Sequence, residues 1–167
     1  MQVDVRRART SDIKAIRALV DTYTADRRLL SKATVTLFEH VQEFWVAVDA
    51  VSDRVVGCGA LHVMWEDLAE IRTVAVDPGF RGQKIGHRIV SELLDVARDL
   101  GVARVFCLTF ETSFFGSFGF AEIDGAPVPH AVYEQLLRSY DEGVAEFLDL
   151  ERVKPNTLGN TRMLLHL

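Results

Sequence analysis

A glycine-containing turn before an amphipathic helix is the feature of this sequence best suited to bind a ligand. Residues 80–86 read F-R-G-Q-K-I-G and follow an apolar run that ends at Val76. A strand that leads through such a turn into a helix leaves free backbone N–H groups at the helix N-terminus, which favour phosphate. A pyrophosphate is therefore the ligand that this chemistry suits. Positive charge around the turn comes from Arg81, Lys84, His87 and Arg88.

The glycine spacing of this turn does not match the common nucleotide-binding patterns. Neither G-x-G-x-x-G nor G-x-x-x-x-G-K-[ST] is present, so a dinucleotide or a nucleoside triphosphate has little support. An ordinary strand–turn–helix connection is equally compatible with these residues taken alone. The pattern therefore leaves phosphate binding open.

Apolar periodicity predicts alternating strands and helices around the turn. Residues 3–9 alternate like a half-buried strand, and Ser11 is expected to cap a helix that begins near Ile13. Segment 141–159 shows no clear pattern. Further strands are expected at 44–50, 54–65, 70–76, 102–110 and 162–167, and helices around Leu37, from Ile85 to about Gly101, and over 132–140.

The composition suits one domain over residues 1–167. A chain of 167 residues with 49% hydrophobic residues can close one core, and its net charge of -5 gives no general attraction for nucleic acid or an anionic membrane. No apolar leader or membrane-length run occurs, so we expect a cytoplasmic protein. Cys58 and Cys107 lie in apolar runs and are expected to be buried thiols. The five histidines show no ligand spacing, so no metal site is expected.

Residues 74–90 resemble the acetyl-CoA-binding motif of GNAT acetyltransferases, R/Q-x-x-G-x-G/A, which follows a strand of the form A-E-I-x-x-V-A-V. Arg81 and Gly86 match the ends of that motif, and F-F-G-S-F-G-F at 114–120 is similar to the family's F-Y-x-x-x-G-F. The resemblance covers residues 69–123. It implies the α/β (α+β) GNAT fold, with a central mixed, mostly antiparallel sheet of six to seven strands, splayed in the middle, and helices on both faces.

The resemblance also implies acetyl-CoA as the co-substrate. The pantetheine arm would pair with the backbone at Val74 and Val76, and the Val74 N–H would stabilise the oxyanion. Lys84 replaces the family's middle glycine, and because lysine does not easily adopt a positive φ, we expect ordinary helical geometry there. The implied cofactor-binding residues are Val74, Ala75, Val76, Arg81, Gly82, Gln83, Lys84, Ile85, Gly86 and His87.

Glu70 stands where some family members carry their general base, and it could act on the amine through a water molecule. The alternative is an ion pair with a neighbouring cation. Family members often have a tyrosine acid where this chain has Phe115. A thiolate leaving group with a pKa of roughly 8.5 needs little help, so we expect a slower enzyme rather than an inactive one. Solvent, Thr109 or Thr112 could supply the proton.

Over nearly its whole length, the chain resembles the short single-domain N-acetylglutamate synthases of actinobacteria. Segments that carry the resemblance include V-R-R-A-R-T-S-D-I, E-I-R-T-V-A-V-D-P and V-K-P-N-T-L-G-N-T-R-M-L-L. It implies acetyl transfer to the α-amine of an amino acid, L-glutamate first and L-glutamine second, in the first step of arginine biosynthesis. Lys32, Arg72 and Arg162 would hold the carboxylates of the acceptor. The alternative for each is a solvated surface cation.

Other functions stay open at this stage. The acceptor could be a different small amine or a protein N-terminus. Phe115 and Lys84 would also suit a degenerate acetyl-CoA-binding sensor, and a structural partner in a larger complex is a further alternative. We expect a small-molecule amino-acid substrate and no nucleic-acid or membrane partner. A homodimer, the preference between glutamate and glutamine, and regulation by arginine are left open.

Overall fold

The computed structural model describes residues 2–24, 33–153 and 159–167. These residues form two compact units, the first from segments 1–62 and 71–99 and the second from segments 63–70 and 100–167. Strands β3 and β4 contribute residues to both units. The single domain expected from the sequence therefore stays a prediction.

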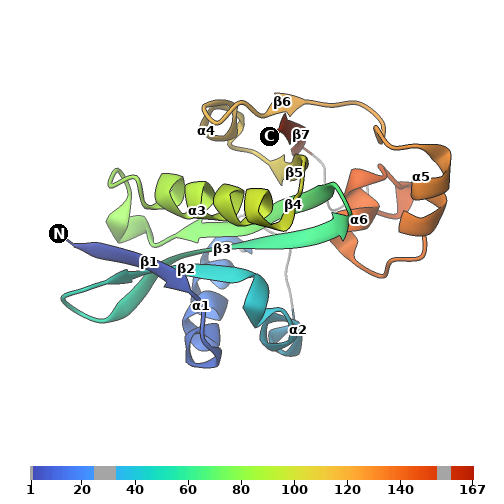
Figure 1. The fold of residues 1–167 in the computed structure, drawn as a ribbon. Helices are drawn as coiled ribbons and strands as arrows, with labels where there is room; N and C mark the ends of the chain where they lie inside the picture. Colours follow the sequence, from blue (N-terminus) through green and yellow to red (C-terminus); the bar gives the residue numbers. More distant parts are fainter. Residues whose placement is uncertain (1, 25–32, 154–158) are drawn as a thin grey trace. The chain divides into compact units, whose positions relative to one another are not determined.

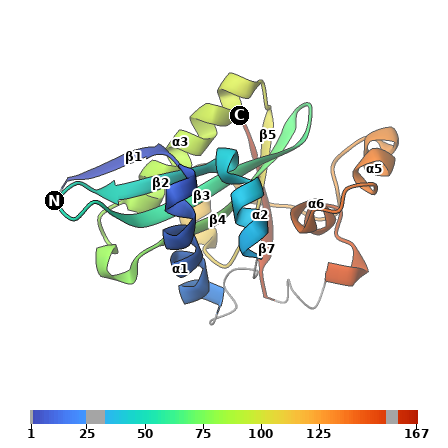
Figure 2. The same cartoon turned by 90° about the horizontal axis from the view of Figure 1, so that it is seen from below.

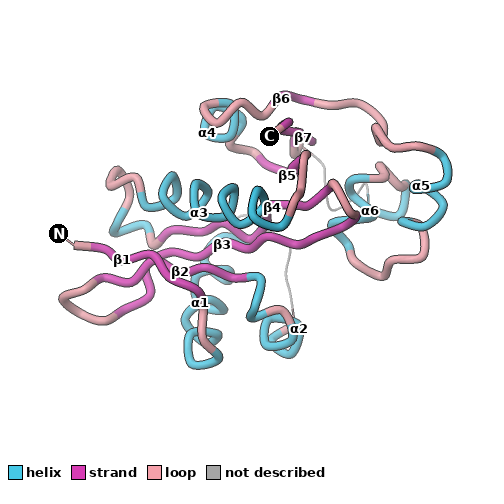
Figure 3. The backbone as a smooth tube through the Cα atoms, viewed as in Figure 1, coloured by secondary structure: helices cyan, strands magenta, loops and turns pink. Residues whose placement is uncertain are grey.

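Seven strands form a mixed, mostly antiparallel sheet in the described part of the chain, as expected (Figure 3). Their order is β1-β2-β3-β4-β5-β7-β6. The β4–β5 pair is parallel, whereas β1–β2, β2–β3, β5–β7 and β6–β7 are antiparallel. The strands are β1 (Val3–Arg7), β2 (Phe44–Asp49), β3 (Arg54–Trp65), β4 (Leu68–Val76), β5 (Arg104–Thr109), β6 (Ala121–Glu122) and β7 (Thr161–His166).

Six α-helices and four 3-10 turns join these strands in the described residues. The α-helices are α1 (Ile13–Thr24), α2 (Thr34–Glu39), α3 (Ile85–Leu100), α4 (Thr112–Gly116), α5 (His130–Leu136) and α6 (Glu142–Phe147). The 3-10 turns are η1 (Thr10–Asp12), η2 (Val41–Glu43), η3 (Pro78–Phe80) and η4 (Glu151–Val153).

In the first unit, helices cover both faces of the sheet (Figures 1 and 2). Helices α1 and α2 pack on one face, where Ile16 and Leu37 join a buried cluster with Val46 and Cys58. Helix α3 packs on the other face. Its approach depends on glycine, because a Cβ added to Gly59 would lie 2.8 Å from the Ile89 side chain.

The start of α1 differs from the expectation. Ser11 lies inside η1, so the prediction that it caps the helix is wrong, and the residue at the cap position is Arg9. The capping hydrogen bond instead comes from Asp12, whose Oδ2 accepts the Arg9 N–H at 2.7 Å. Arg6 donates to both carboxylate oxygens of Asp12, at 2.8 and 3.1 Å. Burial would raise the pKa of Asp12, but these hydrogen bonds outweigh it and lower the pKa.

The second unit has its own hydrophobic core. Leu68 and Phe106 pack there with Leu136, Val144 and Phe147, which come from α5 and α6. The helix predicted over 132–140 is α5, which ends at Leu136, and α6 occupies the segment that showed no clear pattern. The parallel ladder of this unit pairs Leu68–Glu70 with β5, whereas β4 continues to Val76. The parallel ladder therefore covers only the first three residues of β4, and the expected splay stays a prediction.

Candidate active site

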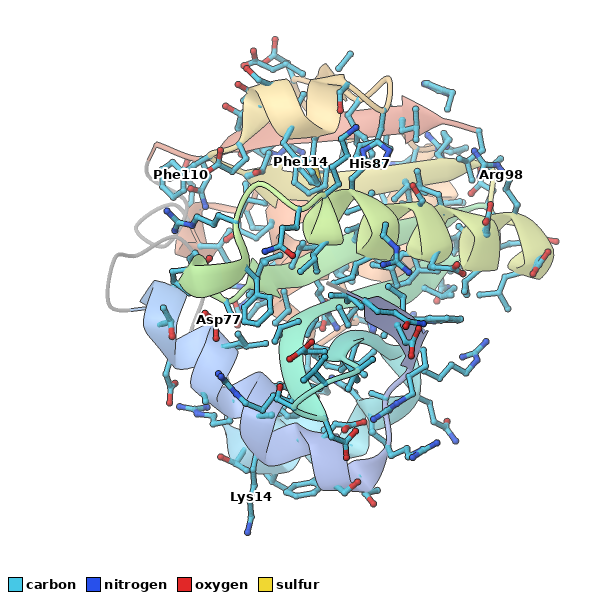
Figure 4. The ribbon with its side chains drawn as sticks, turned by 90° about the vertical axis from the view of Figure 1, so that its left-hand side faces the viewer. Lys14, Asp77, His87, Arg98, Phe110 and Phe114 are labelled. Carbon is cyan, nitrogen blue, oxygen red and sulfur yellow. The ribbon has the colours of Figure 1, made fainter. Side chains whose placement is uncertain are left out.

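The turn between β4 and α3 is held at its start by Asp77, in the first unit. The Asp77 side chain accepts the Gly79 N–H at 2.8 Å, and its own N–H donates to the Val56 carbonyl at 2.8 Å. Arg54 pairs with the same carboxylate at 3.2 Å. Figure 4 labels Asp77 and His87, which stand on either side of the turn. These contacts fix the point at which the chain leaves the sheet.

Two residues of the turn have left-handed backbone geometry, Gly82 at φ +82° and Lys84 at φ +59°. The expectation of ordinary helical geometry at Lys84 is therefore wrong. The Lys84 carbonyl accepts the Arg88 N–H at 3.0 Å, so Lys84 is the residue from which α3 starts. The chain must reverse direction before it enters the helix, and the left-handed conformation achieves this at a cost of roughly 1–2 kcal/mol for a residue with a Cβ.

The first turn of α3 has the backbone chemistry expected of an anion site. The N–H groups at the start of a helix have no acceptor within the helix. Arg88, expected to add charge around the turn, donates from Nη1 to the Val3 carbonyl at 2.6 Å and so also ties α3 to β1.

Strand β4 contains an irregular residue, Thr73, which is buried and has φ +58°. A positive φ is a genuine outlier for a β-branched residue and persists only where its surroundings enforce it. The Thr73 carbonyl accepts a hydrogen bond from the Cys58 thiol at 3.4 Å. The next residue is Val74, whose N–H is the predicted oxyanion donor. No sequence signal indicated this irregularity.

The carbonyl of Val76, predicted to pair with the pantetheine arm, accepts a hydrogen bond from the Tyr23 hydroxyl. Tyr23 lies in the last turn of α1 and packs against the buried cluster of the first unit. Its hydroxyl therefore contacts the end of β4 in a way that helical periodicity alone could not reveal.

Arg72 lies on β4 with only 9% of its side chain exposed, so it is not a solvated surface cation. Its Nη2 lies 3.5 Å from Oε1 of Glu43. The same carboxylate lies 3.0 and 3.1 Å from Nδ1 of His62. Burial would raise the pKa of Glu43, but the hydrogen bond with His62 and the charges of His62 and Arg72 lower it. No pattern in the sequence indicated a role for Glu43 or His62 at the site.

Glu70 is 5% exposed and belongs to the second unit, where it lies opposite Phe106 in the β4–β5 ladder. Burial raises the pKa of the Cys107 thiol, and the negative charge of Glu70 raises it further. Glu70 is joined to Arg72 and to the α3 turn, both in the first unit, through the continuous strand β4.

The Arg162 side chain, on β7, is largely engaged by backbone. Its Nε donates to the Glu146 carbonyl at 3.0 Å, and its Nη2 donates to the carbonyls of Gly125, at 2.8 Å, and Phe147. Burial lowers the pKa of Arg162. In this position the guanidinium holds the C-terminal end of α6. Lys32 lies outside the described residues.

Phe115 is buried and packs edge-on against Phe114 and Phe120. Of the hydroxyls considered as substitutes for a tyrosine acid, Thr109 accepts the Glu111 N–H at 2.8 Å, and Thr112 begins α4.

Cys58 is buried, which raises the pKa of its thiol to about 12 and disfavours a nucleophilic role. Among the residues that the structure describes, no group of three His, Cys, Asp or Glu side chains could hold a metal. No described helix is long and apolar enough to cross a membrane.

Residues 14–123 match the model of the acetyltransferase (GNAT) family. The chain therefore belongs to this family and is an acyltransferase. It is 65% identical over 162 residues to an amino-acid acetyltransferase of Mycobacterium tuberculosis, and this match covers 96% of the chain and 92% of that relative. An amino-acid acetyltransferase of Neisseria meningitidis is 32% identical over 120 residues, which cover 71% of this chain but 27% of that longer protein.

Solved structures agree with this assignment. A crystal structure from Mycobacterium tuberculosis in complex with CoA and NLQ superposes with a TM-score of 0.94 at 64% identity, covering 98% of this chain and 99% of that one. The N-acetylglutamate synthase from Neisseria gonorrhoeae, complexed with coenzyme A and N-acetyl-glutamate, has a TM-score of 0.78 at 23% identity over 35% of its length, which supports the fold alone.

Proposed function

We propose that this protein transfers the acetyl group of acetyl-CoA to the α-amine of an amino acid, L-glutamate first and L-glutamine second. The product with glutamate would be the first intermediate of arginine biosynthesis. The observation that carries the proposal is the 65% identity, over 96% of the chain, to an amino-acid acetyltransferase. Burial of both Glu70 and Arg72 on one strand supports it, because neither is left as an ordinary surface charge.

The proposed cofactor site is the end of β4 and the turn into α3. The pyrophosphate of acetyl-CoA would accept from backbone N–H groups of the first turn of α3, with charge from Arg81 and Lys84. The pantetheine arm would pair with Val74 and Val76. Since the Val76 carbonyl accepts from Tyr23, an arriving amide would share or replace that hydrogen bond. The left-handed residues of the turn support the proposal, because they set the direction in which α3 starts.

In the proposed reaction, Glu70 accepts a proton from the ammonium group of the acceptor, directly or through water. The neutral amine then attacks the thioester carbonyl, and the Val74 N–H donates to the oxyanion that forms. Collapse of the tetrahedral intermediate breaks the carbon–sulfur bond and releases the thiolate of coenzyme A. The thiolate takes a proton from solvent or a nearby hydroxyl, and the amide nitrogen loses its second proton to water.

Arg72 would bind a carboxylate of the acceptor, with Lys32 as a second cation. Glutamate carries two carboxylates, and a chain with a net charge of -5 must supply their partners locally. Glu70 and Arg72 stand two residues apart, the strand spacing that places side chains about 7 Å apart on one face. For Arg162, the three hydrogen bonds to backbone favour support of α6 over direct contact with the acceptor.

A thiol-release screen across the amino acids tests this proposal, preceded by calorimetric titration of acetyl-CoA. We expect turnover to be highest with glutamate or glutamine and at least tenfold lower with lysine. Equal turnover with glutamate and with the cationic amino acid lysine would reject the N-acetylglutamate synthase assignment and leave the acetyltransferase. Acetyl-CoA binding without turnover on any amine would instead support the sensor, for which the buried Phe115 is the favouring observation.

A further inference from the structure

Helix α6 presents a glycine to the Glu70 carboxylate within the second unit. A Cβ added to Gly143 would lie 2.1 Å from Glu70 Oε2 and 2.8 Å from both Cδ and Oε1. Real Cβ atoms essentially never approach another heavy atom closer than 3.0 Å. The backbone of α6 therefore lies against the carboxylate at a distance that no residue with a side chain could match.

The backbone conformation does not explain this glycine. Gly143 is the second residue of α6 and is absent from the glycines with positive φ, which are Gly82, Gly101, Gly119, Gly125 and Gly159. Any residue could adopt its helical geometry, and alanine is a better helix former than glycine. The contact with Glu70 remains as the physical reason for a glycine at this position.

Helix α6 is held at both ends, so it cannot easily move to accept a larger residue. At its N-terminus, Asp141 Oδ2 accepts the Val144 N–H at 3.1 Å. At its C-terminus, Arg162 donates to the carbonyls of Glu146 and Phe147. Between these ends, Val144 and Phe147 are buried in the hydrophobic core of the unit. A clash at Gly143 would therefore displace the Glu70 side chain rather than the helix.

We infer that Gly143 is a positioning residue for catalysis, because its bare backbone determines where the Glu70 carboxylate stands. The inference rests on the proposed role of Glu70 as the general base. A methyl group at residue 143 would force the carboxylate to move by about 1 Å to reach an allowed contact. Displacements of this size at a reacting group can cost on the order of a hundredfold in rate.

The first test is the turnover of Gly143→Ala in the full-length protein. We expect kcat to fall thirtyfold or more, while the Kd for acetyl-CoA, measured by calorimetry, stays within twofold. Gly116→Ala is the matched control, because Gly116 is also a helical glycine of the second unit, without a positive φ, and an added Cβ would meet nothing within 4 Å. Its kcat should be unchanged. Wild-type kcat in Gly143→Ala would overturn the inference.

A second test separates the role of Gly143 from that of Glu70. Glu70→Gln keeps the side-chain size but removes the base, so adding Gly143→Ala to it should lower kcat no further than twofold. A full thirtyfold additional loss would show that Gly143 acts otherwise and would overturn the inference. Wild-type turnover of Glu70→Gln alone would instead reject the proposed base.

A third measurement applies if Gly143→Ala folds poorly. Replacing Glu70 by alanine removes the atoms that the new methyl group would meet, so Gly143→Ala/Glu70→Ala should fold with a Tm close to that of Glu70→Ala. Recovery of the Tm in the double variant would support the contact as the reason for the glycine. A double variant no more stable than Gly143→Ala would contradict it.

Discussion

The guanidinium of Arg72 lies 3.5 Å from the carboxylate of Glu43, which in turn contacts Nδ1 of His62. Arg72 comes from β4, Glu43 from the 3-10 turn before β2, and His62 from β3. The carboxylate limits the positions open to the guanidinium. In the proposed function, the carboxylate of the acceptor would therefore meet an arginine that is already oriented.

Replacing Arg72 with leucine should raise the KM for glutamate at least tenfold, because a charge-assisted partner of the acceptor is lost. The Kd for acetyl-CoA should change little. Steady-state kinetics with each substrate varied in turn, together with calorimetry, would measure both effects. Arg98→Leu is the control, since Arg98 forms an exposed pair with Asp95 at 3.0 Å. A Michaelis constant unchanged by Arg72→Leu would exclude this arginine from the acceptor site.

Glu70→Gln should reduce kcat roughly a hundredfold or more near neutral pH, because the amide cannot accept the proton. Raising the pH should restore part of the loss, since more of the amine is then neutral without help. The measurement is a kcat–pH profile for the wild type and the variant. Glu66→Gln, at an exposed position before β4, provides the control. Parallel profiles for Glu70→Gln and the wild type would assign Glu70 to structure.

Lys84→Gly should raise the free energy of unfolding by up to about 1 kcal/mol, because glycine adopts the observed positive φ without strain. The greater freedom of glycine in the unfolded chain offsets part of this gain. Lys84→Ala is the matched variant, since it removes the same charge but keeps the strain. Urea unfolding of the three proteins gives the comparison. A glycine variant less stable than the alanine variant would show that Lys84 does not strain the turn.

Asp12→Asn should destabilise the fold by about 1–2 kcal/mol at neutral pH, since Asp12 caps the first helix and pairs with Arg6. The folded protein lowers the pKa of Asp12, so its contribution is present above the unfolded pKa and is lost as the pH falls through the folded pKa. The stability difference between the two proteins should therefore shrink below about pH 4. Urea unfolding curves measured between about pH 3 and 7, in steps of about half a pH unit, would check this. A difference independent of pH would contradict the argument.

Local patterns in the sequence were sufficient for much of the fold and part of the candidate site. The apolar stripe from Ile85 predicted α3, and the apolar run ending at Val76 predicted β4 with its turn. Each of these signals comes from residues that are close together in the sequence, so it can be recognised without the tertiary structure. The resemblance to the GNAT motif in this segment indicated the family, and the family model confirmed it.

Tertiary structure alone decided how the charged residues are used. Nothing near Gly143 in the sequence indicates that its backbone meets Glu70, or that Arg162 donates to carbonyls at the end of α6. The left-handed geometry of Thr73 and Lys84 opposes their intrinsic preferences, so it depends on the packing around them. Contacts between residues distant in the chain form only when the sheet brings their strands and helices together, and sequence periodicity describes each element separately.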